Sequence, residues 1–163
     1  MTRTLILMRH AKSDWGSASL PDHARPLNAR GASDAPLMGE WLRQQRQLPD
    51  EVLCSTATRT QETFAGLRLD AAIRPLPSLY HADPDTMLDA LQTASGACVL
   101  MVGHNPGIAA FAADLVAKAP DHPRFDDYPT SATLVVTFDI PDWAALHYGT
   151  GRAVAFAIPA DLK

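Results

Sequence analysis

The sequence predicts an α/β fold, a three-layer sandwich in which a mostly parallel central sheet is flanked by helices. Two observations indicate this fold. Short apolar runs that suit buried strands recur along the chain, and stretches with helical spacing of apolar residues fall between the earlier runs. Strands that alternate with helices are typical of a parallel sheet covered on both faces. The 163 residues suit one domain, 1–163, with one core.

Six segments are predicted to be strands. The first contains four consecutive apolar residues, which favour a buried strand over an amphipathic helix of that length. The last two are joined by a turn-rich connection, so we expect them to pair antiparallel at one side of the sheet. The predicted strands are Thr4–Met8, Glu51–Ser55, Ala72–Leu76, Ala97–Gly103, Ala132–Phe138 and Ala153–Ile158.

Four segments are predicted to be helices. The longest has its apolar residues at roughly helical spacing, with charged residues elsewhere. Asp83 is a candidate N-cap followed by proline, and Asn105-Pro106 repeats this pattern before the last helix. The predicted helices are Ala29–Gln47, Thr58–Leu67, Pro84–Thr93 and Gly107–Lys118.

The composition narrows the classes of partner. Apolar residues make up 47% of the chain and charged residues 20%, which is typical of a globular protein. The net charge of −4 argues against a nucleic-acid binder or a protein that binds anionic membranes, although a local basic pocket for a small anion is compatible with it. No apolar stretch has the length of a membrane span.

The two cysteines, Cys54 and Cys98, both lie in apolar strand-like runs. We expect two buried free thiols in a reducing compartment, because disulfides are rare there. The first residues lead directly into a predicted strand without the pattern of a signal peptide. We therefore expect a cytoplasmic protein, and the negative charge and lack of apolar surface stripes favour a monomer.

Arg9 and His10 directly follow the first predicted strand. In open α/β sheets, ligands bind beyond the carboxyl ends of the strands. Arginine offers a planar fork of donors for phosphoryl oxygens, and a neutral histidine can attack phosphorus. The pair by itself also fits an ordinary solvated strand end, so other segments must decide between these readings.

Two further strand–helix junctions carry similar residues. His104 lies between a predicted strand and a helix N-terminus, where free N–H groups favour anions. Arg59 lies in the first turn of another helix, where a cation is unfavourable by roughly a few tenths of a kcal/mol unless an anion is near. The alternatives are a histidine in a capped turn and an ordinary surface arginine.

The loop Ser13–Asn28 is long for its position, and such loops are uncommon unless they are functional. Within it, Arg25 precedes a proline, which favours an extended backbone that can aim the side chain across the loop. The alternative for Arg25 is an ion pair with Asp22 that anchors the loop. Together, the junctions and this loop are suited to binding one phosphoryl group.

With these motifs in this order and spacing, the chain resembles the histidine phosphatase superfamily, in its short SixA-type branch of phosphohistidine phosphatases. The resemblance runs nearly from end to end. Its motifs are Leu7–Ser13, Asp22–Gly31, Cys54–Thr63, Leu79–Ala82, Val102–Gly107 and Pro129–Ala132.

The resemblance implies a phosphoglycerate mutase-like fold and a phosphatase that needs neither a metal nor another cofactor. His10 is implied as a nucleophile that forms a transient phosphohistidine. Arg9 and Arg59 would bind the phosphoryl oxygens, and His104 would complete the phosphate pocket. The further substrate-binding residues that we expect are Arg25, Ser13 and Asn105.

The chain departs from the family in two respects. Ala11 stands where most members carry glycine, although the SixA-type branch accepts alanine there. The acidic proton donor of the ester-cleaving branches has no counterpart, which leaves Asp22 and His81 as candidate donors. The alternative for both residues is a purely structural role in their loops. Because the chain lacks the carboxylic acid of the ester-cleaving branches, phosphohistidine is favoured as substrate, since its leaving imidazole accepts a proton readily.

Two other functions stay open at this point. One is a general small-molecule phosphomonoesterase or a phosphoglycerate mutase-like enzyme, although a mutase needs a lid for which this chain is short. The other is a catalytically idle module that binds phosphorylated ligands. In each case the expected partner is a phosphorylated protein or a small phosphorylated substrate, and not a nucleic acid or a membrane.

Overall fold

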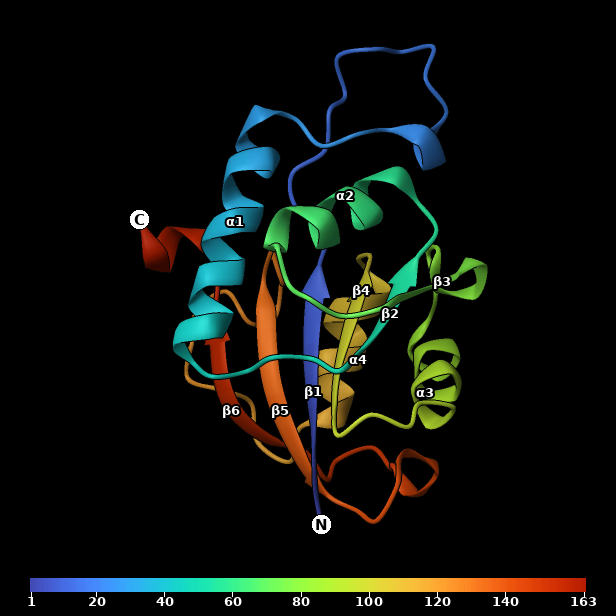
Figure 1. Ribbon diagram of the computed structural model, residues 1–163, viewed down its shortest axis with the longest axis vertical. Coiled ribbons are helices and arrows are strands. Elements are labelled where there is room, and N and C mark those ends of the chain that lie inside the picture. The colour runs from blue at the N-terminus through green and yellow to red at the C-terminus, as the bar shows by residue number, and fades with distance from the viewer.

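The computed structural model describes residues 1–163 and has three layers, with one central sheet between two layers of helices (Figure 1). The strands are β1 Thr2–Arg9, β2 Glu51–Ser55, β3 Ile73–Leu76, β4 Cys98–Gly103, β5 Thr133–Asp139 and β6 Arg152–Ala157. The helices are α1 Ala29–Gln44, α2 Thr58–Leu67, α3 Pro84–Gln92 and α4 Gly107–Leu115. The predicted α/β class is therefore confirmed.

The six strands lie in the order β3-β2-β4-β1-β5-β6. Four of them, β3, β2, β4 and β1, are parallel to one another. The strand β5 is antiparallel to both β1 and β6, which confirms the antiparallel pairing predicted for the last two strands. The carboxyl ends of β1, β2 and β4 consequently lie at the same edge of the sheet, and the long loop after β1 arches over that edge (Figure 1).

Alternate residues of β1 face opposite sides of the sheet and supply two separate cores. Leu5 and Leu7 pack in one cluster with residues of α3 and α4, such as Phe111. Ile6 and Met8 pack in the other cluster with residues of α1 and α2. All four β1 side chains are fully buried, as expected for an apolar run at the centre of a sheet with two covered faces.

Several helices end earlier than predicted, and the backbone shows why. The helix α1 stops at Gln44 because Arg46 adopts a left-handed conformation with a φ of 58°. The helix α4 stops at Leu115, because Val116 is extended and pairs with Gly151. Apolar periodicity alone does not report such local turns.

Both cysteines are free, as predicted, but only Cys54 is fully buried, whereas Cys98 is half-buried. None of the helices combines the length and the apolar character that crossing a bilayer would require.

Candidate active site

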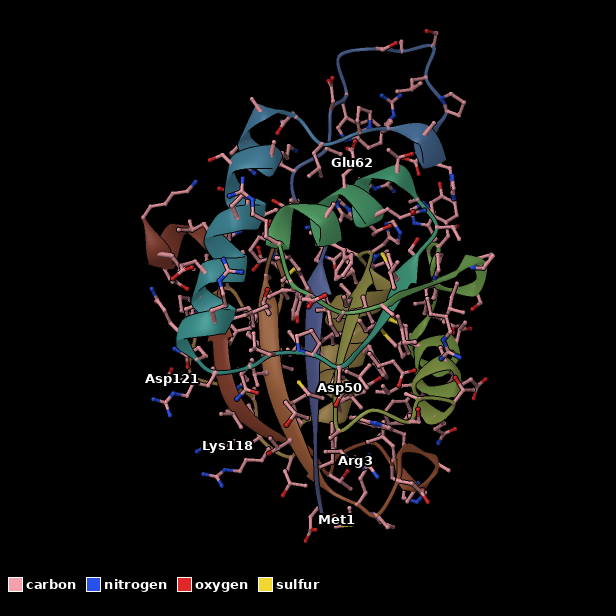
Figure 2. All side chains as sticks on the ribbon, viewed as in Figure 1. Met1, Arg3, Asp50, Glu62, Lys118 and Asp121 are labelled. Atoms are coloured by element: carbon pink, nitrogen blue, oxygen red, sulfur yellow. The ribbon has the colours of Figure 1, made fainter.

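Three parallel strands deliver the predicted catalytic residues to one edge of the sheet. Arg9 is the last residue of β1 and lies opposite Gly103, the last residue of β4. His10 and His104 come directly after these two neighbouring strands, and α2 begins three residues after β2. Figure 2 shows Glu62 of α2 at this end of the molecule, whereas Met1 and Arg3 lie at the opposite end.

A cavity of about 200 Å³ opens at this edge. His10, Arg59 and His104 are buried and Arg9 is half-buried, and we call the part of the cavity that these four residues form the floor. Trp15 and His81 are exposed, and we call the rim that they form the mouth. The cavity is lined by Arg9, His10, Lys12, Ser13, Trp15, Asp22, Arg59, His81, His104, Asn105 and Thr130.

His10 is held in one orientation and one tautomer. Its Nδ1 lies 2.7 Å from the carbonyl oxygen of Ala11. Since a carbonyl oxygen only accepts hydrogen bonds, Nδ1 carries the proton and Nε2 keeps its lone pair. Ala11 is itself fixed, because its N–H donates to the Thr63 hydroxyl at 2.9 Å.

The surroundings of His10 also keep its ring neutral. Burial, helped by the nearby charges of Arg9 and Arg59, lowers the pKa of His10 to about 4. The hydrogen bond to the Ala11 carbonyl opposes this shift but does not outweigh it. A neutral ring with a free Nε2 has the protonation state that a nitrogen nucleophile requires.

His104 lies beside His10, with 5.3 Å between the ring centroids. Its Nε2 is hydrogen-bonded to the Ser55 hydroxyl at 2.8 Å, whereas its buried Nδ1 has no partner. Burial and, secondarily, repulsion from His10 and Arg59 together lower the pKa of His104 to about 2. A bound anion would counter both effects, since it would offer a partner and a negative charge.

The two arginines approach the floor from different elements. Arg9 donates to the carbonyl of Tyr128 at 3.2 Å, and burial together with repulsion from Arg59 lowers its pKa. Arg59 donates to the backbone carbonyl of Asp22 at 2.7 Å and to its carboxylate at 3.1 Å. A guanidinium has five N–H donors, so Arg59 retains three for a ligand.

Asp22 does not have the properties of the proton donor that we considered from the sequence. Its Oδ2 accepts hydrogen bonds from Tyr80, from Arg59 and from Nε2 of His81 at 3.1 Å. The hydrogen bond from Tyr80, followed by those from His81 and Arg59, holds the pKa of Asp22 well below its usual range. The carboxyl group is therefore ionised at neutral pH and has no proton to donate.

Arg25 is a second correction. Its backbone is extended, as expected before a proline, but its side chain does not line the cavity. The buried guanidinium donates to the carbonyl of Ser17 at 3.0 Å and lies 4.2 Å from the ring centroid of Trp15. The alternative ion pair with Asp22 is absent as well, because Asp22 pairs with Arg59. Arg25 thus supports the long loop from within.

Ser13 and Asn105 do line the cavity, but their polar atoms already have partners. The hydroxyl of Ser13 accepts from the indole N–H of Trp15 at 2.8 Å. The amide of Asn105 donates to the carbonyls of residues 127 and 128, and its oxygen accepts from the N–H of Ala109. Asn105 therefore caps α4 from two positions before its first residue and fixes the adjacent backbone.

Sequence reasoning missed the residues that position the histidines. Thr63 lies one helical turn after Arg59, so the two share a face of α2, and Ser55 ends β2. Both positions lie within a recognised motif, but the groups that they fix, the N–H of Ala11 and the ring of His104, come from other segments of the chain. The structure contains no group of three or more His, Cys, Asp or Glu side chains placed to hold a metal ion.

Comparison with known proteins gives matches along nearly the whole chain. Residues 5–82 match the model of the histidine phosphatase superfamily (branch 1). The phosphohistidine phosphatase SixA of Escherichia coli is 30% identical over 143 residues, which cover 83% of this chain and 85% of that protein. The structure of a SixA-type protein from Nakamurella multipartitia superposes with a TM-score of 0.83 at 33% identity, over 98% of this chain and 97% of the other. A protein histidine phosphatase SixA in complex with tungstate has a TM-score of 0.79 at 27% identity, over 98% and 99% of the chains.

We predict that the rings of His10 and His104 stay neutral as the pH falls from about 8 to about 5, because burial opposes their protonation. NMR titration of the ring C–H signals, assigned with the variants His10→Gln and His104→Gln, measures this directly. As the pH falls, the unfolded chain takes up a proton at this histidine near pH 6.5, whereas folded His10 takes it up only at about 4. The free energy of unfolding should therefore decrease as the pH falls through that interval. A His10 signal with a midpoint near 6.5 would contradict the prediction.

Proposed function

The chain belongs to the histidine phosphatase superfamily, and on that basis we propose that it removes the phosphoryl group from phosphohistidine on proteins, with His10 as the nucleophile and without a metal. The observation that carries the proposal is the state of His10. Its ring is neutral, its Nε2 is free and it lies among Arg9, Arg59 and His104 on the floor of the cavity.

In the proposed first step, Nε2 of His10 attacks phosphorus while the bond from phosphorus to the leaving nitrogen breaks. The electron pair of that bond stays on the leaving nitrogen, and the other nitrogen of the leaving ring carries a proton, so imidazole departs neutral. Phosphorylated His10 is then cationic in its ring, and the Ala11 carbonyl that accepts from Nδ1 stabilises this form. Water attacks its phosphorus in the second step, which releases phosphate and restores His10.

The charge of the transferred group is the main demand that phosphoryl transfer makes on a protein. Arg9 and Arg59 repel each other at the floor, so an anion between them removes repulsion and gains hydrogen bonds. The buried setting strengthens these interactions because little water screens them. These residues supply the charge stabilisation for which other phosphatases use a metal ion.

The proposed substrate follows from the leaving group. An alkoxide leaves poorly unless an acid protonates it, whereas the imidazole of phosphohistidine carries its own proton. Asp22 is ionised, so His81 at the mouth, with its Nε2 beside that carboxylate, is the remaining candidate donor for esters. His81 is half-exposed and open to water, which makes it a modest acid catalyst and favours phosphohistidine over alkyl esters.

We expect His10→Ala to lower kcat by at least about a thousandfold, as for the loss of a nucleophile. Turnover of a phosphohistidine peptide is measured in the presence of EDTA, since no metal is proposed to take part. The wild type should also yield acid-labile, alkali-stable phosphate on His10. His147→Ala is the matched control, because His147 is exposed and does not line the cavity. Near-normal turnover by His10→Ala would refute the mechanism.

We expect Arg59→Ala to lower kcat/KM by about a hundredfold, in line with the loss of a donor to transition-state charge. Arg59→Lys should recover only part of the activity, because an ammonium lacks the planar fork. The control is Arg68→Ala, which removes an exposed arginine at the other end of the same helix. Unchanged kinetics per folded molecule, combined with a large fall in Tm, would instead assign Arg59 a structural role.

The substrate assignment predicts a ranking. The kcat/KM for a phosphohistidine peptide should exceed that for the matching phosphoserine peptide by on the order of a hundredfold, the range that a missing general acid explains. Aryl phosphates, whose leaving groups are also good, should fall between them. His81→Gln should lower ester turnover more than phosphohistidine turnover. A sugar phosphate as the best substrate would favour the general phosphomonoesterase, and binding without turnover of any compound would favour a binding module.

A further inference from the structure

Trp15 is a large aromatic residue at the mouth of the cavity that no step of the proposed mechanism uses. It is 59% exposed, and it lines the same cavity as His10. Single exposed apolar residues are common on protein surfaces, so exposure alone says little. Leu48, for example, is also 59% exposed but lies in the connection between α1 and β2, away from the cavity.

What distinguishes Trp15 is how firmly the protein holds it. Its Nε1 donates to the hydroxyl of Ser13 at 2.8 Å, and Ser13 is buried. The guanidinium of Arg25 lies 4.2 Å from the ring centroid, which is the geometry of a cation–π contact. The indole is therefore fixed in the loop while more than half of its surface stays open to solvent.

Arg25 supports the loop from an energetically unfavourable buried position. It is buried, its Nε has no hydrogen-bond partner, and its two Nη1 contacts go to the carbonyls of Asp14 and Ser17. A buried cation that lacks a carboxylate partner costs folding free energy. These contacts hold the loop directly around Trp15. The unfavourable burial of Arg25 therefore goes together with an ordered position of this ring. A preorganised aromatic ring loses little entropy when a ligand stacks on it.

We propose that Trp15 binds the leaving group of the substrate, a planar aromatic ring, and specifically the imidazole of phosphohistidine. This inference rests on the proposed function. The phosphoryl group on the floor is attacked by buried His10, and in phosphoryl transfer the leaving atom lies roughly in line on the opposite side. That direction leads away from the floor and toward the mouth, where Trp15 lies.

The chemistry of the ring favours histidine over tyrosine as its source. Before it departs, the phosphorylated imidazole is protonated on its other nitrogen and carries a positive charge. The face of an indole attracts such a cation more strongly than it attracts a neutral phenyl ring. The proton stays on the ring as the P–N bond breaks, so Trp15 stabilises the reactive form of the substrate without transferring a proton itself.

Two substrates with the same type of bond test this role. Phosphoimidazole and phosphoramidate both contain a P–N bond, but only the first has a ring. We expect Trp15→Ala to lower kcat/KM for phosphoimidazole by about tenfold, which is the size of one aromatic contact. For phosphoramidate, which has no ring, the loss should be less than about twofold. Trp15→Phe should retain most of the activity on phosphoimidazole, and Leu48→Ala is the equally exposed control.

Each other outcome overturns a different statement. Equal losses of kcat/KM on both substrates would show that Trp15 only orders the loop. No loss on either substrate would show that the leaving imidazole does not contact Trp15. Phenyl phosphate separates the two sources of an aromatic ring, since a larger loss on phenyl phosphate than on phosphoimidazole would assign the site to phosphotyrosine. A wild-type protein that turns over neither P–N compound would refute the proposed function, and this inference with it.

Discussion

Arg9 and Gly103 face each other across the parallel pair of β1 and β4, and this register places two histidines, each one residue further along, in contact. A shift of one residue in either strand would turn its alternating side chains to the opposite face and separate the rings. The register is fixed by burial on both faces, because Leu5 and Leu7 fill one core while Ile6 and Met8 fill the other. The geometry of the site is therefore a consequence of core packing.

Burial then decides the chemistry of the residues that the sheet has brought together. In water, two arginines and two histidines would be hydrated and their mutual repulsion screened. On the floor of the cavity the histidines are neutral, and Nε of Arg9 is buried without a hydrogen-bond partner. The unliganded site is thus electrostatically unfavourable. An anion that binds there relieves this unfavourable energy, which favours binding.

Much of the fold could be predicted from the sequence, because periodicity and strand–helix alternation are local properties. His10, Arg59 and His104 were placed together for a related reason, since the topology of a parallel sheet collects its strand ends at one edge. Arg25 was misplaced because a proline restricts the backbone of the preceding residue but does not say which way a long loop folds. For Asp22 the sequence left a proton donor and a structural role open, because its partner Tyr80 lies 58 residues away and reaches it only in the folded chain. What remained unpredictable was the environment of each side chain, which depends on contacts between distant segments.

The antiparallel direction of β5 has a consequence for how this architecture diversifies. Thr133, the first residue of β5, lies beside Met8 near the carboxyl end of β1, so the connection that precedes β5 arrives at the site edge. Its residue Ser131 donates its N–H to the carbonyl of His10 at 3.0 Å. Two loops, one after β1 and one before β5, therefore border the same opening from opposite directions in the chain. Surface loops accept insertions far more readily than strands do. An insertion in either loop could therefore change access to the nucleophile without altering the sheet that positions it.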